Sequence, residues 1–143
     1  LPLGPLGTEQ ELVDGEGATL AIEPLMLSMA SAFSLEATVD LVHRHGGLAL
    51  AAHVDRRSFS VPSQLGFIPP GTAFQALELS AHGARVGRSA AFDALGYALT
   101  TASDAHAPEL VGDGFVVLEV ASPAFGELAL ALAGADGRGC AIA

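Results

Sequence analysis

Three short, mainly apolar runs separated by helix-like stretches constrain the fold of this chain more than any other feature. The runs occupy residues 48–52, 76–80 and 98–102. A strand that reads as a nearly continuous hydrophobic run is typical of a sheet covered on both faces. Strands that alternate with helices predict βαβ units, so we expect an α/β fold with mostly parallel strands.

The segments between these runs carry helix start and stop signals. Ser34 can cap a helix whose apolar residues recur on one face, and Gly46 can end it. By the same reasoning we expect a helix at 88–95 and another from Ser122 to Gly134, with Pro123 at its first position. The remaining expected elements are strands at 18–27, 115–120 and 140–143, a loop at 1–17, and a long loop at 57–75 with one helical turn near Ser63.

Composition bounds the class of protein. With 143 residues, half of them apolar, the chain can bury one hydrophobic core, and we divide it into an N-terminal segment 1–33 and a main part 34–143. No apolar stretch reaches the ~20 residues of a membrane helix, and the first residues lack the basic start of a secretory signal. The single cysteine, Cys140, excludes an internal disulfide. We therefore expect a cytoplasmic protein, and the first residue, which is not Met, indicates a trimmed product.

The charge of the chain restricts its partners. Sixteen acidic residues stand against six arginines, with no lysine, for a net charge of −10. Most of such a surface repels a polyanion, so duplex nucleic acid is not an expected partner. A small anion held by local arginines or metal ions remains compatible with this composition.

Metal-capable side chains follow two of the predicted strands. His53 comes directly after the run 48–52, and Asp104 and His106 follow the run 98–102. In parallel α/β folds, functional residues collect at the carboxyl ends of strands. Imidazole and carboxylate ligands without a nearby thiolate suit Zn, Mn or Fe. The alternative is that Asp104 caps the following turn and that each histidine is bonded to backbone.

Two arginines lie beside the first of these candidate ligands. Arg56 and Arg57 indicate a substrate-binding role toward an anion, although they could instead balance the charge of Asp55. His82, which follows the run 76–80, is a weaker candidate for substrate contact. His43 and His45 are expected at the surface, where a cation complements the end of a helix.

Two of these stretches resemble motifs of a known family. Residues 46–56 (GGLALAAHVDR) resemble the third motif of the PHP (polymerase and histidinol phosphatase) domain, and residues 101–106 (TASDAH) resemble its fourth. The segments 58–60, 65–70 and 76–80 also look like a bacterial phosphoesterase branch of this family. The resemblance covers roughly residues 34–138.

The resemblance implies a fold and a chemistry. PHP domains are distorted seven-stranded (β/α) barrels that commonly hold two or three Zn, Mn or Fe ions and hydrolyse phosphoesters. On this resemblance His53, Asp104 and His106 are metal ligands and Arg56 contacts phosphate. The family's first two motifs belong upstream of Ser34, yet residues 1–33 contain no histidine. The chain therefore resembles the C-terminal half of such a domain, with little activity expected for that half alone.

Two other functions stay open at this stage. A half-barrel can act as a non-catalytic module that forms a homodimer or binds its missing N-terminal half, because an incomplete sheet leaves an edge to pair. Related barrels also hydrolyse amide bonds with metal ions. Arg56 and Arg57 favour a small phosphorylated substrate over an amide.

Overall fold

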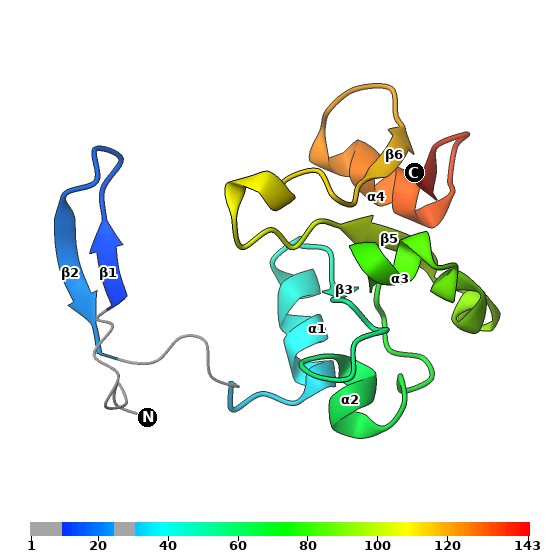
Figure 1. The fold of residues 1–143 in the computed structure, drawn as a ribbon, viewed down its shortest axis with the longest axis horizontal. Coiled ribbons are helices and arrows are strands. Elements are labelled where there is room, and N and C mark those ends of the chain that lie inside the picture. The colour runs from blue at the N-terminus through cyan, green and yellow to red at the C-terminus, as the bar shows by residue number, and fades with distance from the viewer. Residues whose placement is uncertain (1–9, 25–30) are drawn as a thin grey trace. The chain divides into compact units, whose positions relative to one another are not determined.

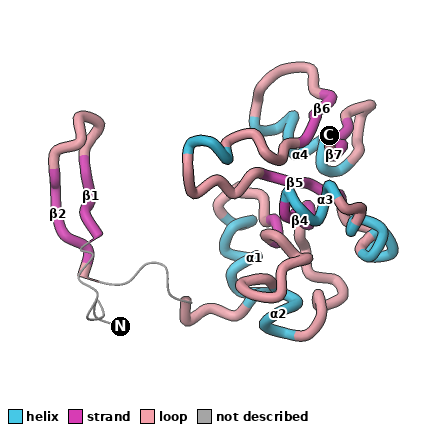
Figure 2. Tube along the Cα trace, viewed as in Figure 1, coloured by secondary structure: helices cyan, strands magenta, loops and turns pink. Residues whose placement is uncertain are grey.

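The computed structural model describes residues 10–24 and 31–143. The chain divides into two compact units, Leu1–Ser34 and Leu35–Ala143, which we describe separately. Figure 1 shows the course of the chain, and Figure 2 shows the helices, strands and loops along it.

The described part of the first unit contains a β-hairpin. Strand β1 (Gln10–Val13) pairs antiparallel with β2 (Thr19–Glu23). The carboxylate of Asp14 accepts hydrogen bonds from the backbone N–H groups of Glu16 and Ala18, at 3.0 and 2.8 Å, which is how Asp favours a turn. The strand expected at 18–27 is thus confirmed at 19–23, and its residues 25–27 lie outside the described part. The loop expected at 1–17 is wrong at β1, since a short strand without alternating polarity gives no signal.

The second unit begins with the helix that the sequence predicts. Helix α1 (Leu35–Arg44) has Val39 buried, and Leu35 and Val42 pack against the core. The chain leaves the helix at Gly46, whose φ of 75° lies in the left-handed region that favours glycine.

A three-stranded parallel sheet forms the centre of this unit. Strands β3 (Leu50–Ala51), β4 (Ala76–Ser80) and β5 (Ala98–Ala102) pair in that order. Leu77 and Leu79 of the middle strand are fully buried, as an apolar strand with neighbours on both sides should be. The predicted strands at 76–80 and 98–102 are confirmed, whereas the run 48–52 forms only two strand residues.

The connections between these strands differ partly from expectation. The helical turn expected near Ser63 is α2 (Val61–Leu65), which Ser60 caps through hydrogen bonds with Ser63. Helix α3 (Ala81–Arg85) replaces an expected loop because the Ser80 hydroxyl accepts the N–H of Gly83 and caps it. The helix expected at 88–95 is found only as two 3₁₀ turns, η1 (Arg88–Ala91) and η2 (Asp93–Leu95), and the second ends at Gly96 as expected. A glycine at the N-cap offers η1 no side-chain cap.

The C-terminal segment is antiparallel. After the 3₁₀ turn η3 (Pro108–Leu110), strand β6 (Val116–Glu119) pairs with β7 (Gly139–Ile142), and α4 (Phe125–Ala133) lies between them in sequence. The expectation of mostly parallel strands therefore holds for β3, β4 and β5 only. Helix α4 begins after Ala124 rather than at Pro123 and ends at Gly134, as expected.

The fold is thus mixed α/β, with one small parallel sheet and two antiparallel pairs. No barrel is identified among the described strands. No helix within residues 10–24 and 31–143 is long and apolar enough to cross a membrane.

Candidate functional site

The predicted ligands lie at one edge of the parallel sheet. His53 follows the end of β3, Ser80 ends β4, and Asp104 follows the end of β5. Because the three strands are parallel and adjacent, their carboxyl ends meet at the same edge. Arg56 joins two of these loops through an ion pair of 2.8 Å between its Nη1 atom and Oδ2 of Asp104.

The three candidate ligands are only partly brought together. His106 Nε2 lies 3.6 Å from Asp104 Oδ1, and the His106 side chain is 84% exposed. His53 Nδ1 is buried without a hydrogen-bond partner among the described atoms, which is costly for a polar atom unless something else bonds to it. His53 and Asp104 also have positive φ angles, 31° and 48°, which are uncommon for residues with a Cβ and recur at functional sites.

These observations do not complete a metal site. No group of three or more His, Cys, Asp or Glu side chains within the described residues could hold a metal ion. The orphaned nitrogen of His53 fits a ligand role, but the Asp104 carboxylate is bonded to Arg56 instead. A metal centre at this edge requires further donors, so we derive no reaction step through a metal from these residues.

A cleft of about 370 Å³ opens beside this edge. That volume lies within the usual range for small-molecule sites. Its charged lining is mainly cationic, with three of the chain's six arginines. The lining residues are Asp55, Arg56, Arg57, Ser80, Ala81, His82, Arg88 and Ser103. The structure thus gathers both predicted substrate-binding arginines and the weaker candidate His82 in one place.

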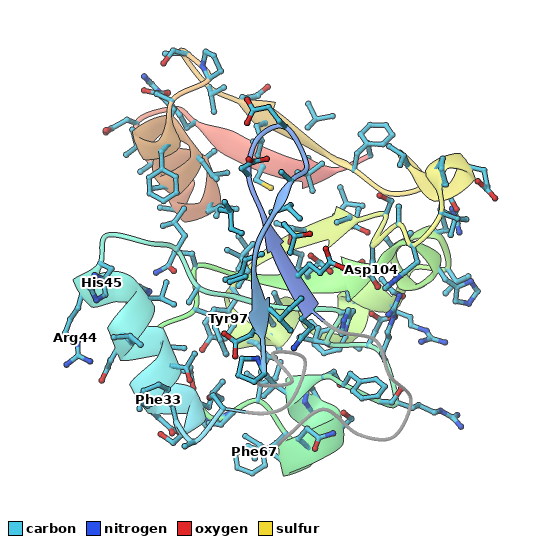
Figure 3. All side chains as sticks on the ribbon, turned by 90° about the vertical axis from the view of Figure 1, so that its left-hand side faces the viewer. Phe33, Arg44, His45, Phe67, Tyr97 and Asp104 are labelled. Atoms are coloured by element: carbon cyan, nitrogen blue, oxygen red, sulfur yellow. The ribbon has the colours of Figure 1, made fainter. Side chains whose placement is uncertain are left out.

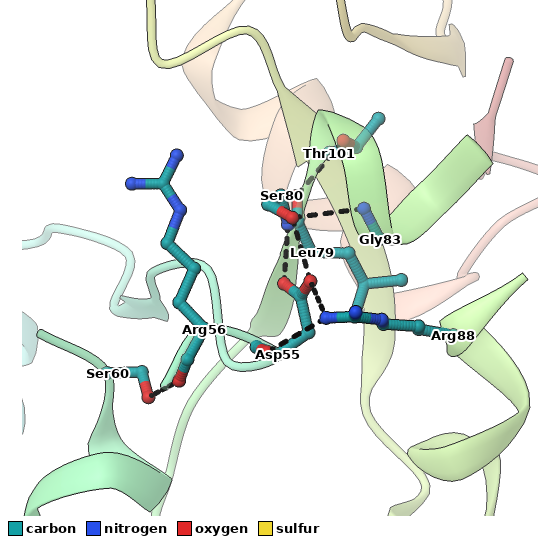
Figure 4. A network of polar contacts seen from close by, with 8 residues as sticks. All are labelled: Asp55, Arg56, Ser60, Leu79, Ser80, Gly83, Arg88 and Thr101. Carbon is teal, nitrogen blue, oxygen red and sulfur yellow. Dashed lines mark hydrogen bonds and ion pairs between the residues drawn. The ribbon is translucent and has the colours of Figure 1, made fainter. Parts of the chain in front are cut away.

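Asp55 organises the wall of the cleft (Figure 4). Its side chain is only 2% exposed. One carboxylate oxygen accepts the backbone N–H of Ser80 and the other accepts the Ser80 hydroxyl, both at 2.7 Å. Nη1 of Arg88 lies 3.4 Å from the second oxygen and donates to the backbone carbonyl of Asp55 at 3.3 Å. The carboxylate therefore ties the loop that follows β3 to the end of β4 and to Arg88.

The ionised state of Asp55 is favoured. Burial raises the pKa of this carboxyl, but the hydrogen bonds that Ser80 donates and the nearby Arg88 outweigh burial and hold the pKa below its ordinary value. Asp55 thus stays negatively charged at neutral pH and can balance one arginine. This differs from the sequence-based alternative, in which Asp55 balances Arg56 and Arg57.

A glycine in α3 permits this arrangement. A Cβ atom on Gly83 would lie 2.1 Å from Oδ2 of Asp55, far inside contact distance. Any side chain at position 83 would push the carboxylate away from Ser80. Gly83 is therefore required by a close approach, since its φ is not in the left-handed region.

Sequence reasoning missed three of the cleft's residues. Arg88 was expected only as the first residue of a helix, and Ser80 only as the end of a strand. Ser103 was seen only within the fourth-motif resemblance. A usable signal for Ser80 existed, since serine directly after an apolar run is a favoured helix N-cap.

The other histidine near the core is structural. His43 Nε2 lies 3.0 Å from Oε1 of Gln75, which also accepts the N–H of Ala49 at 2.6 Å. Since that oxygen is only an acceptor, Nε2 carries the proton. The surface position expected for His43 is wrong, because this side chain is partly buried, whereas His45 is exposed as expected.

No protein-family model, curated protein or solved structure matches the chain.

Proposed function

We propose that the chain is the C-terminal part of a PHP-like, metal-dependent phosphoesterase, and that the arginine-lined cleft binds the phosphate group of its substrate. The observation that carries this proposal is the convergence of Arg56, Arg57 and Arg88 on one cleft of a chain whose net charge is −10. Two of these arginines are paired with carboxylates, Arg56 with Asp104 and Arg88 with Asp55. Arg57 supplies the unbalanced positive charge, so the cleft attracts an anion that most of the remaining surface repels.

The phosphate preference follows from the side chains. Guanidinium groups match phosphate oxygens in geometry and can donate two parallel hydrogen bonds. Arg57 forms no hydrogen bond or ion pair with the described residues, and its guanidinium is therefore ready for a ligand. An amide group itself carries no negative charge, so the arginines of this cleft favour a phosphoester over the amidohydrolase alternative.

The remaining parts of the proposal rest on the motif resemblance. His53, Asp104 and His106 are the candidate ligands for Zn, Mn or Fe, and further donors come from an N-terminal half in the intact enzyme. That half would also complete a (β/α)7 barrel by pairing with the edge of β3 that no other described strand occupies. We place the protein in the cytoplasm, where a lone thiol such as Cys140 stays reduced.

Phosphate titration calorimetry of the purified chain tests the cleft. Wild type should bind inorganic phosphate, and Arg56→Ala with Arg57→Ala should weaken binding about tenfold or more, as expected for the loss of charge-assisted bonds. Arg44→Glu, at the end of α1, is the matched control because it lowers the net charge by the same two units. Figure 3 shows Arg44 projecting outward, well separated from Asp104. Equal weakening in the control would contradict a site at the cleft.

A turnover assay tests the half-domain part of the proposal. With Zn or Mn added, the chain alone should not hydrolyse p-nitrophenyl phosphate, because too few ligands are present to hold adjacent ions. Hydrolysis that depends on His53 would show that the chain is an enzyme by itself.

A second candidate function is a non-catalytic binding module. It is favoured by apolar side chains displayed on the loop around α2, where Phe59, Leu65 and Phe67 are 87%, 47% and 57% exposed. Exposed aromatic residues on one segment are typical of contact surfaces. Sedimentation equilibrium separates the two candidate functions. If the chain is a dimer and the double variant Phe59→Ser with Phe67→Ser is a monomer that still binds phosphate, a separate contact surface is supported.

A further inference from the structure

Arg88 is the cleft residue that neither the motifs nor the strand ends explain. It comes from η1, which follows β4 and α3 in the sequence. Gly87, which precedes Arg88, has a φ of 72°, a left-handed conformation that glycine adopts without strain. The chain therefore turns immediately before Arg88. The Arg88 side chain is 49% exposed, so it is a wall of the cleft rather than part of the core.

Only one edge of the Arg88 guanidinium is used within the described residues. Both of its hydrogen bonds run from Nη1 to Asp55, one to the backbone carbonyl at 3.3 Å and one to the carboxylate at 3.4 Å. The other donors of the group are left for a ligand, since guanidinium carries five N–H bonds in a fixed plane. Asp55 itself is fixed by Ser80 at 2.7 Å, which makes it a firm anchor.

We propose that Arg88 is a third anion-binding residue of this cleft and that Asp55 is the residue that positions it. The inference rests on the proposed function only in taking the cleft as an anion site. Figure 4 shows the chain of contacts: the Ser80 backbone holds the Asp55 carboxylate, and that carboxylate holds the tip of Arg88. Arg88 then meets the anion with its free donors, in the cleft that Arg57 also lines.

A purely electrostatic role and a positioning role for Asp55 make opposite predictions for the phosphate affinity of Asp55→Asn. By charge alone, removing a negative group from the cleft wall should strengthen the binding of phosphate. If Asp55 positions Arg88, the same change should weaken binding, because a neutral amide holds the guanidinium less firmly and lets it move into solvent. The direction of the change therefore separates positioning from simple electrostatics.

The experiment is a calorimetric titration of the folded chain with inorganic phosphate at pH 8. We expect Arg88→Ala to weaken binding about tenfold, equivalent to ~1.4 kcal/mol. Asp55→Asn should weaken binding about threefold to tenfold, and Arg88→Lys should recover only part of the loss because lysine lacks the planar fork. Tyr97→Phe, which removes a hydrogen bond at the start of β5, controls for a general loss of stability.

The outcomes distinguish the two proposals. Wild type that binds no phosphate would overturn the proposed function together with this inference. Binding that depends on Arg56 and Arg57, but is unchanged in Arg88→Ala, would overturn the inference alone. Tighter binding by Asp55→Asn would overturn the positioning role.

Discussion

Replacing Gly83 with alanine tests the Asp55 anchor most severely. The added Cβ would lie 2.1 Å from Oδ2 of Asp55, 2.7 Å from its Cγ and 3.2 Å from the Ser80 hydroxyl. The carboxylate is buried and bonded on both oxygens, so it cannot swing aside without losing its partners. The substitution should therefore destabilise the fold even though alanine is the better helix former.

The magnitude follows from opposing terms. Two hydrogen bonds to a charged group contribute about 3 kcal/mol at the lower end of their usual range. Alanine has a higher helix propensity than glycine, which offsets up to about 1 kcal/mol of this loss in the free energy of unfolding. We expect a net loss of about 2 kcal/mol in the free energy of unfolding, measured by urea denaturation.

Gly126 in α4 provides the matched control. A Cβ at that position would meet nothing within 4 Å, so Gly126→Ala should be neutral or stabilising. In an Asp55→Ala background the two closest contacts of the Cβ are gone and only the Ser80 hydroxyl at 3.2 Å remains. Gly83→Ala should then destabilise the fold much less, which appears as a coupling free energy in the double-mutant cycle. If Gly83→Ala is as stable as Gly126→Ala, the account of the anchor is refuted.

Three further predictions concern single groups. Because the pKa of Asp55 in the folded chain lies below its ordinary value of about 3.9, ionised Asp55 stabilises the fold above that pH, and this stability is lost as the pH falls through the folded pKa. Asp55→Asn should show a smaller acid-induced loss in unfolding followed by circular dichroism. Tyr97→Phe removes a hydrogen bond of 2.7 Å to the carbonyl of Thr72 and should cost about 1 kcal/mol in urea denaturation. Burial raises the pKa of the Cys140 thiol, so iodoacetamide should label it slowly at pH 8 until urea exposes it, whereas equal rates in both conditions would contradict that burial.

Strand and helix positions were predictable where apolar pattern and capping agree. Strands β4 and β5 carry the expected bounds because each is a short, mainly apolar run, and α1 has both an apolar face and a glycine stop. The antiparallel pairing of β6 and β7 was not predictable, since the direction of pairing depends on the chain path and leaves no period in the sequence.

The candidate site was predictable only in part for a similar reason. Strand ends located His53, Asp104 and Arg56, because topology alone brings the carboxyl ends of parallel strands together. Arg88 enters the cleft through the turn at Gly87 and the buried carboxylate of Asp55, and both are tertiary features. Nothing about an arginine after a glycine distinguishes it from an ordinary surface residue.

A crystal structure of the chain soaked with tungstate would test the central claim most directly. Tungstate mimics a phosphate dianion, and its tungsten atom can be located by anomalous scattering. We predict one main peak in the cleft, within hydrogen-bond distance of Arg57 and Arg88. A main peak elsewhere on the chain, or an empty cleft at saturating tungstate, would contradict it.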